Sequence, residues 1–353
     1  MVKFRNCVIN VAFESIWEDM MKSVIFGLAV AGSAFLFSAG AQAADDCGEI
    51  TIAEMNWASA EFIANLDKVV LEEGFGCSVE LIPGATMTTF ASMESKGEPM
   101  VAPELWANAV QTPLKKAVEE GRMAVLNMAP ITGAGEGWMI SSSVAKANNL
   151  KTVSDVLARP DLFPHPEDAK KGGLVTCPSG WGCQIATGQL FKAFGMEDKG
   201  WQMVDPGSSA GLDGSIEKAA TRQEAWFGYY WGPTVLASKA GLTLLDMGEF
   251  AGNDNWDNCI MVPECADPKP TGWVTSVVTT TVASDFFKNG PEASKGYMEK
   301  RQFPAEVMNK MLVWMNSNQA SGEDAAYEFL AKYPQVWNSW VPADVAAKIK
   351  AAL

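Results

Sequence analysis

Histidine is nearly absent from this 353-residue sequence, in which His165 is the single example. One histidine cannot supply the two or three imidazole ligands of common zinc sites, and it restricts catalysis that depends on a histidine base. The chain also lacks a His-Glu-x-x-His motif and a phosphate-binding nucleotide loop. These absences favour a binding protein over an enzyme. An enzyme that works through a pair of carboxylates stays open.

Basic side chains are also in short supply. The sequence has 27 Lys and Arg residues against 42 Asp and Glu residues, which gives a formal net charge of −15. Phosphate backbones and anionic lipid headgroups repel such a surface. The composition therefore predicts no nucleic-acid partner, and it is compatible with a cationic ligand. We expect the protein to be a monomer.

An apolar run from Val24 to Phe37 is too short to span a bilayer, which takes about 20 residues. It follows Met-Lys-Ser and ends in small residues that include Ala-Gln-Ala at 41–43, the pattern of a secretory signal. We predict a signal peptide at 21–43 and a periplasmic mature protein, with a retained membrane anchor as the alternative. Residues 1–20 carry acidic side chains that suit no export signal, and we expect them to be a non-native extension.

Cysteine usage agrees with export, because secreted chains commonly contain disulfides. Beyond the leader there are six cysteines: Cys47, Cys77, Cys177, Cys183, Cys259 and Cys265. Fifteen pairings are possible for six cysteines. The spacing favours Cys177 with Cys183, Cys259 with Cys265, and Cys47 with Cys77. Zinc ligation is disfavoured because no Cys-x-x-Cys motif is present.

Hydrophobic periodicity indicates an α/β protein. Alternating residues predict strands at 48–54 and 77–82, and helical spacing predicts a helix at 59–74 between them. Such a strand–helix–strand unit builds parallel sheets. A second series of strands and helices begins near residue 174, and the chain is mainly helical from Pro304 onward.

We predict two lobes that are joined by two hinge crossovers, near 138–141 and 274–280. The first lobe would comprise residues 44–139 plus 277–353, and the second residues 140–276. A cleft between two lobes is a favoured ligand site. Two sequential domains are the alternative.

Tryptophan is abundant, with 13 residues in the sequence. Five of them follow predicted strands or lie beside glycines, where cleft loops form: Trp57, Trp106, Trp138, Trp181 and Trp231. The face of an indole ring attracts cations, and quaternary ammonium groups are typical guests of such rings. We expect core packing instead for Trp314, Trp337 and Trp340, and leave open Trp201, Trp226, Trp256 and Trp273.

Cys-Pro-Ser-Gly-Trp-Gly-Cys at 177–183 is similar to a loop of the glycine betaine substrate-binding proteins of ABC transporters. Trp57, the Tyr-Trp-Gly-Pro at 230–233 and the Tyr-Pro-Gln-Val-Trp-Asn-Ser-Trp-Val-Pro at 333–342 also resemble that family. The resemblance implies a two-lobed type II periplasmic-binding-protein fold that closes on a trimethylated amine and passes it to a membrane permease. It implies an aromatic box made from Trp57, Trp181 and Trp231.

The same resemblance implies that the backbone amides of Gly182 and Cys183 face an anionic oxygen of the ligand. The motifs lack a neighbouring His or Arg, and Glu136 stands near the expected cleft instead. A carboxylate there would repel betaine and favour choline, or, once protonated, would bond the oxygen of trimethylamine N-oxide. We therefore rank trimethylamine N-oxide and choline ahead of glycine betaine. For Glu136, the alternative is a solvated glutamate at the hinge with no ligand contact. For the function, the alternative is a carbohydrate-binding protein.

Metal and cofactor signals are weak. Gly-Asn-Asp-Asn-Trp-Asp-Asn at 252–258 offers oxygen ligands of the kind calcium prefers, with Asp254 and Asp257 as the candidates. The segment lacks the full spacing of a calcium loop. We otherwise predict no cofactor.

Overall fold

The structure is a computed structural model that describes residues 47–353. The predicted extension at 1–20 and the predicted signal peptide at 21–43 lie outside the described residues. Within the described range, no helix combines the length and the apolar character needed to cross a membrane.

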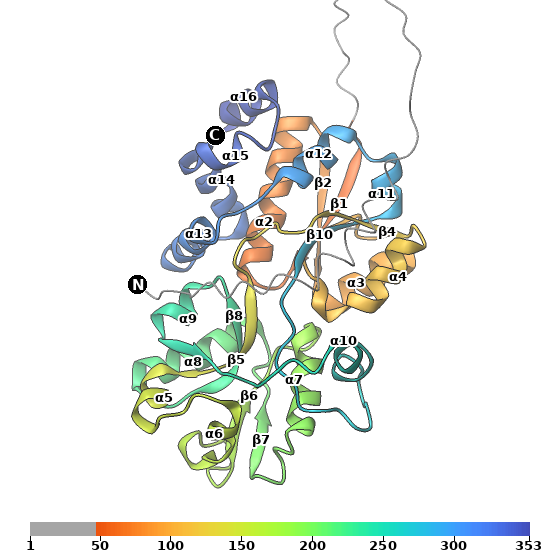
Figure 1. The fold of residues 1–353 in the computed structure, drawn as a ribbon. Helices are drawn as coiled ribbons and strands as arrows, with labels where there is room; N and C mark the ends of the chain where they lie inside the picture. Colours follow the sequence, from red (N-terminus) through yellow and green to blue (C-terminus); the bar gives the residue numbers. More distant parts are fainter. Residues whose placement is uncertain (1–46) are drawn as a thin grey trace, which may run out of the picture. The chain divides into compact units, whose positions relative to one another are not determined.

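Two five-stranded sheets organise the described residues, one in each of two lobes (Figure 1). In the first sheet the order is β2 (Ser78–Gly84), β1 (Glu49–Met55), β3 (Val101–Trp106), β10 (Val278–Ala283), β4 (Met123–Asn127). In the second it is β7 (Trp201–Val204), β6 (Gly172–Val175), β8 (Phe227–Gly232), β5 (Gly135–Ser141), β9 (Leu242–Leu244). Both sheets are mixed, with β10 antiparallel to its neighbours in the first and β5 in the second.

Helices surround both sheets. Those of the first lobe are α2 (Ala58–Val69), η1 (Val70–Phe75), α3 (Thr86–Lys96), η2 (Ala107–Ala109), α4 (Gln111–Glu119), α11 (Ser284–Asn289), α12 (Glu292–Lys300), α13 (Ala305–Asn318), α14 (Gly322–Lys332), α15 (Pro334–Trp337) and α16 (Ala343–Ala352). Those of the second are α5 (Ser142–Asn148), α6 (Val153–Leu157), η3 (Pro160–Leu162), α7 (Gly182–Ala193), α8 (Ser209–Arg222), α9 (Val235–Lys239), α10 (Asn253–Asn255) and η4 (Trp256–Ile260).

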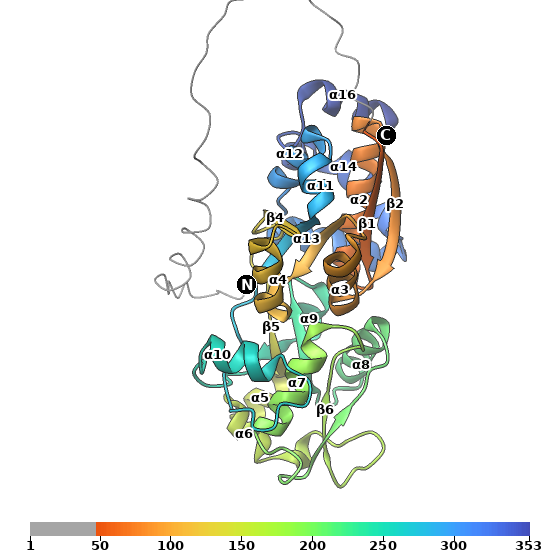
Figure 2. The same ribbon diagram turned by 90° about the vertical axis from the view of Figure 1, so that its right-hand side faces the viewer.

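The core of the first lobe joins the two ends of the described chain. Helix α2 packs against α14, and α16 packs against the π-helix η1 that continues α2 (Figure 2). Trp337 and Trp340 are buried in this core, as predicted. Prolines stand at the starts of α12, α13, α15 and α16, where a missing N–H costs the helix nothing.

In the second lobe, side chains alternate along β8. Phe227 and Trp231 pair with Ile140 and Glu136 of β5, so these four side chains lie on one face of the sheet. Tyr230 points to the other face and donates to Asp213 of α8 at 2.7 Å. Because strand residues alternate with period two, this register decides which rings reach the cleft.

The crossings between the sheets differ from the predicted positions. All of β5 pairs within the second sheet, so the first crossing lies at 128–134 and not at 138–141. At the second predicted crossover, 274–280, strand pairing begins only at Val278, the first residue of β10. Strand pairing thus places the boundary between the first and the second lobe before residue 135. The exact residue limits of the two lobes stay a proposal.

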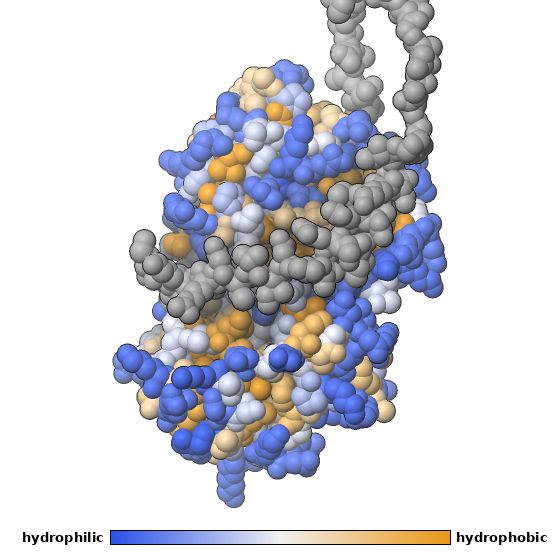
Figure 3. All heavy atoms as spheres, in the orientation of Figure 1, coloured by the Kyte–Doolittle hydropathy of each residue, from blue (hydrophilic) through white to orange (hydrophobic). Residues whose placement is uncertain are grey.

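The three disulfides have the pairing that the spacing favoured. Cys47 bonds Cys77, Cys177 bonds Cys183, and Cys259 bonds Cys265. The first joins the start of β1 to the start of β2, and the second closes the loop that leads into α7. Figure 3 shows hydrophilic residues over much of the described surface on one face of the molecule, in keeping with the net charge of −15.

Candidate functional site: an aromatic cavity between the lobes

A pocket lies where the two lobes meet, and we refer to it as the cavity. Its walls come from the ends of β1, β3, β5 and β8, the start of α7 and the segment before β10. The lining residues are Trp57, Thr86, Trp106, Asn108, Ala109, Glu136, Trp181, Gly182, Cys183, Ala186, Tyr229, Trp231, Trp256, Met261 and Trp273. Glu136 is the one charged side chain among these described residues, and none of them is Lys, Arg or His.

Most of the residues that the sequence pointed to meet at this cavity. They are Trp57, Trp106, Glu136, Trp181, Gly182, Cys183 and Trp231. Contrary to the prediction, Trp138 does not reach it. Trp138 shares a strand face with Glu136 but lies two residues further into the lobe, where its fully buried ring packs on Phe194 and Phe227.

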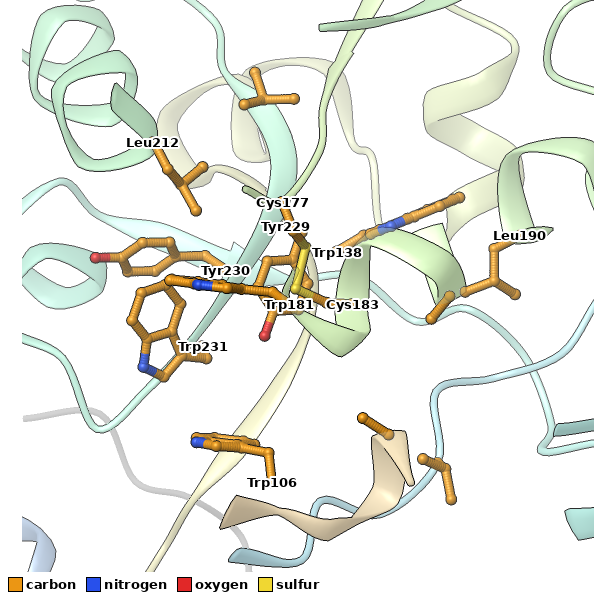
Figure 4. Close-up of a cluster of buried hydrophobic side chains, with 14 of the residues drawn as sticks. Trp106, Trp138, Cys177, Trp181, Cys183, Leu190, Leu212, Tyr229, Tyr230 and Trp231 are labelled. Carbon is orange, nitrogen blue, oxygen red and sulfur yellow. A yellow bond between two sulfur atoms is a disulfide. The ribbon is translucent and has the colours of Figure 1, made fainter. Parts of the chain in front are cut away.

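Three indoles form a continuous edge-to-face series. The ring centroids of Trp57 and Trp181 are 5.4 Å apart at 74°, and those of Trp181 and Trp231 are 5.1 Å apart at 81°. Figure 4 shows Trp181 beside Trp231, with Trp106 across the site and the Cys177–Cys183 disulfide next to Trp181. Perpendicular rings present faces in different directions, which suits a compact guest better than a flat one.

Glu104 holds the indoles of Trp57 and Trp106 from outside the cavity. It is fully buried on β3 and does not line the cavity. Its Oε1 accepts hydrogen bonds from Nε1 of Trp57 at 2.8 Å, Oγ of Ser59 at 2.9 Å and Nε1 of Trp106 at 3.0 Å. Burial raises the pKa of Glu104 to about 7, although these donors and Arg301 oppose the rise. Strand β3 is buried at every position, which makes a carboxylate in it unusual.

Glu136 carries the charge at the cavity wall and joins the lobes. One carboxylate oxygen accepts from Nδ2 of Asn108 at 2.6 Å, and the other accepts from the hydroxyl of Tyr229 at 2.5 Å. Asn108 belongs to η2 of the first lobe, whereas Glu136 and Tyr229 belong to the second sheet. Burial raises the pKa of Glu136 above its usual range against the effect of these donors.

The loop before α7 also bridges the lobes. Nε1 of Trp181 donates to Oδ1 of Asn56 at 2.7 Å, and the backbone N–H of Met87 donates to the carbonyl of Gly180 at 3.0 Å. Gly182 and Cys183 are the first residues of α7, so their N–H groups have no acceptor within the helix and carry its positive end. The start of α7 can therefore attract a negatively charged ligand oxygen.

Eight lining residues were not predicted to contact a ligand: Thr86, Asn108, Ala109, Ala186, Tyr229, Trp256, Met261 and Trp273. Tyr229 shares the face of β8 with Trp231, and a strict reading of strand alternation would have found it. Asn108 follows the Trp of β3, and no motif marks it. Trp256 and Trp273 were left open, because their positions depend on the path of the long segment that precedes β10. Their ring centroids lie 5.5 Å apart.

The structure gives no support to the calcium site predicted at 252–258. Asp254 and Asp257 lie in helical turns and accept hydrogen bonds from Asn258 and Thr112, respectively. Among the described residues, no three His, Cys, Asp or Glu side chains are grouped as metal ligands.

Two mixed sheets with an aromatic cavity between them define a solute-binding protein fold. The family model for the substrate-binding domain of the ABC-type glycine betaine transport system matches residues 48–332, and the chain belongs to this family. The family serves transport, and its members bind small ligands and work with the permease of an ABC transporter. A search of curated proteins found no match.

Solved structures share the fold. A glycine betaine/L-proline-binding protein from Borrelia burgdorferi is 18% identical, with a TM-score of 0.67 over 85% of this chain and 99% of that one. A choline-binding protein in complex with choline is 17% identical, with a TM-score of 0.68 over 87% and 98%. The lactococcal OpuAC, closed on glycine betaine, is 16% identical, with a TM-score of 0.62 over 84% and 100%.

Proposed function

We propose that this chain is a periplasmic receptor that captures a trimethylated amine in the aromatic cavity and delivers it to the permease of an ABC transporter. The observation that carries the proposal is the cavity lining, in which indole and phenol rings surround a single carboxylate. Indole faces attract a cation that offers no hydrogen bonds, and the interaction strengthens to about 2 kcal/mol or more when the site is dry.

The charge of Glu136 ranks the ligands. A betaine carboxylate beside it would meet a like charge, unless one of the two groups held a proton. Choline brings only positive charge, which the ionised Glu136 balances. Trimethylamine N-oxide presents an oxygen that needs a donor, and the raised pKa of Glu136 favours the protonated, donating form. Trimethylamine N-oxide and choline therefore rank ahead of glycine betaine.

Ligand capture would work through the two lobes. The site takes walls from both sheets, and the bonds of Asn108 to Glu136 and of Trp181 to Asn56 cross between them. A guest that touches both sets of walls stabilises the arrangement in which the lobes meet. The permease would then recognise this arrangement. We propose that the receptor acts as a monomer.

A carbohydrate-binding protein is the first alternative. Sugars also stack on aromatic rings, but their hydroxyls require many polar partners. The polar side chains that line the cavity, Thr86, Asn108, Glu136 and the Tyr229 hydroxyl, are few for such a ligand. Competition by a sugar for the site would favour this alternative.

An enzyme is the second alternative. The cavity has one carboxylate in its lining and not the pair that acid–base catalysis would use. Residues 207–211 do have the Gly-x-Ser-x-Gly spacing of serine hydrolases, with Ser209 at the start of α8. The single histidine, His165, is engaged with backbone groups of Met203 and Glu167. Turnover of a candidate solute by the purified protein would support catalysis.

Calorimetric titration of the mature protein tests the proposal. Trimethylamine N-oxide, choline and glycine betaine would be titrated in parallel, with a neutral sugar as the fourth ligand. We expect tight binding of one of the first two and weaker binding of glycine betaine. Binding of none of the three amines would refute the aromatic-cavity proposal, and leave the fold and the family untouched.

A further inference from the structure

The indoles of Trp57 and Trp106 share one hydrogen-bond acceptor that lies outside the cavity. Oε1 of Glu104 accepts both indole N–H groups and the hydroxyl of Ser59, whereas Oε2 is buried without a partner. A buried carboxylate oxygen with no donor is uncommon, because the desolvation of such a group costs free energy. Core packing alone would be served better by an apolar residue on this fully buried strand.

We propose that Glu104 is a positioning residue of the site, whose carboxylate holds the Trp57 and Trp106 rings in place and supplies negative charge behind them that a cationic guest senses. This inference rests on the proposed function, since it assumes that these rings receive a cation. An indole whose N–H bonds a carboxylate is polarised, so that its face becomes more negative. One ionised group would thus strengthen two ring contacts at once.

The surroundings of Glu104 leave its charge largely uncompensated. The elements packed against β3 carry these ionisable groups: Glu49 and Glu54 on β1, Glu61, Asp67 and Lys68 on α2, and Glu94 and Lys96 on α3; strand β10 carries none. Arg301, which follows α12, is the charge that acts on Glu104, and it is itself engaged by Asp67 at 2.8 Å. Burial keeps the pKa of Glu104 at about 7, within reach of ordinary buffers.

Binding and protonation are therefore coupled. A cation bound against the two rings favours the ionised form of Glu104, so it lowers the pKa of that carboxyl and releases a proton near neutral pH. By linkage, affinity for a cation must rise as the pH rises through about 7. Glu136 would produce a similar trend at its own pKa, so the two carboxylates have to be separated by variants.

The first test needs no ligand. In protein labelled at the tryptophan indole nitrogens, the N–H NMR signals of Trp57 and Trp106 should titrate together with a midpoint near pH 7. Glu104→Gln should abolish this shared titration, and Glu61→Gln, which alters a carboxylate that accepts from Gly322, should not. Signals that titrate separately, or that still titrate in Glu104→Gln, would overturn the positioning role.

The second test uses tetramethylammonium, which has no oxygen and so probes only the rings and their charge. In Glu136→Gln, which removes the other carboxylate, its Kd should fall by roughly threefold or more between pH 6 and pH 8. In the double variant Glu104→Gln/Glu136→Gln the fall should be less than about 1.5-fold. An equal pH dependence in the single and the double variant would overturn the charge role. Failure of tetramethylammonium to bind the unmodified protein would instead refute the proposed function, while the NMR titration would still decide whether Glu104 holds both rings.

Ser59→Ala serves as a second variant in case Glu104→Gln does not fold. It removes one of the three donors to Glu104 and leaves both indoles and the carboxylate in place. Because this donor lowers the pKa of Glu104, its loss should move the indole titration to higher pH. An unchanged midpoint would show that the titrating group is not Glu104.

Discussion

Ala109 of the first lobe leaves no room for a side chain on Gly182 of the second. A Cβ built on Gly182 would lie 2.1 Å from Cβ of Ala109, far inside van der Waals contact. Both residues line the cavity. The absence of a side chain at the start of α7 thus decides how closely the lobes approach at the ligand site.

Gly182→Ala should weaken ligand binding because the added methyl group holds the lobes apart. Overpacking of this kind costs about 1–3 kcal/mol, which corresponds to a loss of roughly 5-fold to 150-fold in affinity. Calorimetry with the preferred amine measures it. Gly188→Ala is the matched control, since Gly188 lies on the same helix and a Cβ there meets nothing within 4 Å. Equal affinities for the two variants would contradict the close approach.

Trp181→Ala should reduce affinity at least about tenfold, because it removes the central ring of the edge-to-face series and the bond to Asn56. Titration of the preferred amine measures the loss. Trp314→Ala removes a partly buried ring on α13 and should leave affinity unchanged. Unchanged affinity in Trp181→Ala would remove this residue from the proposed cage.

The protonation of Glu136 should give choline and trimethylamine N-oxide opposite pH dependences. Choline favours the ionised carboxylate, so its affinity should rise as the pH passes the raised pKa of Glu136. The N-oxide needs the protonated form, so its affinity should fall over the same range. In Glu136→Gln, choline should bind roughly tenfold more weakly and the N-oxide without a pH dependence from this group. Parallel pH profiles of the two ligands in the unmodified protein would refute this role.

Periodicity and spacing were enough to predict the framework of the molecule. Strands β1 and β2 and the helix between them fall where the sequence placed them, since their apolar residues recur at regular spacing. The short spacings between cysteines selected the correct disulfides, because close residues meet most often in the unfolded chain. The tryptophan-containing loop at 177–183 identified the family.

The contacts within the site were harder to predict, because they depend on which elements cover each strand. Trp138 and Glu136 occupy the same face of β5, and only the position of α7 puts one in the core and the other at the cavity. Glu104 stood in an apolar run as a residue that ordinary core packing does not explain. Its three donors come from β3 and from the chain around the start of α2, and no local pattern joins them.

The raised pKa of Glu104 should also appear in the stability of the protein. The carboxyl ionises near 4.5 in the unfolded chain and near 7 in the folded one, so the folded state holds the proton longer. Stability from this group is therefore complete below pH 4.5 and is lost as the pH rises toward 7, by about 3 kcal/mol in all. Glu104→Gln has no carboxyl to ionise at this position, so its stability does not fall for this reason. The difference in the free energy of unfolding between the variant and the unmodified protein, measured by urea denaturation, should grow over this window and level off above it. A difference that is constant from pH 4.5 to pH 8 would show that Glu104 ionises in the folded protein as it does in the unfolded chain.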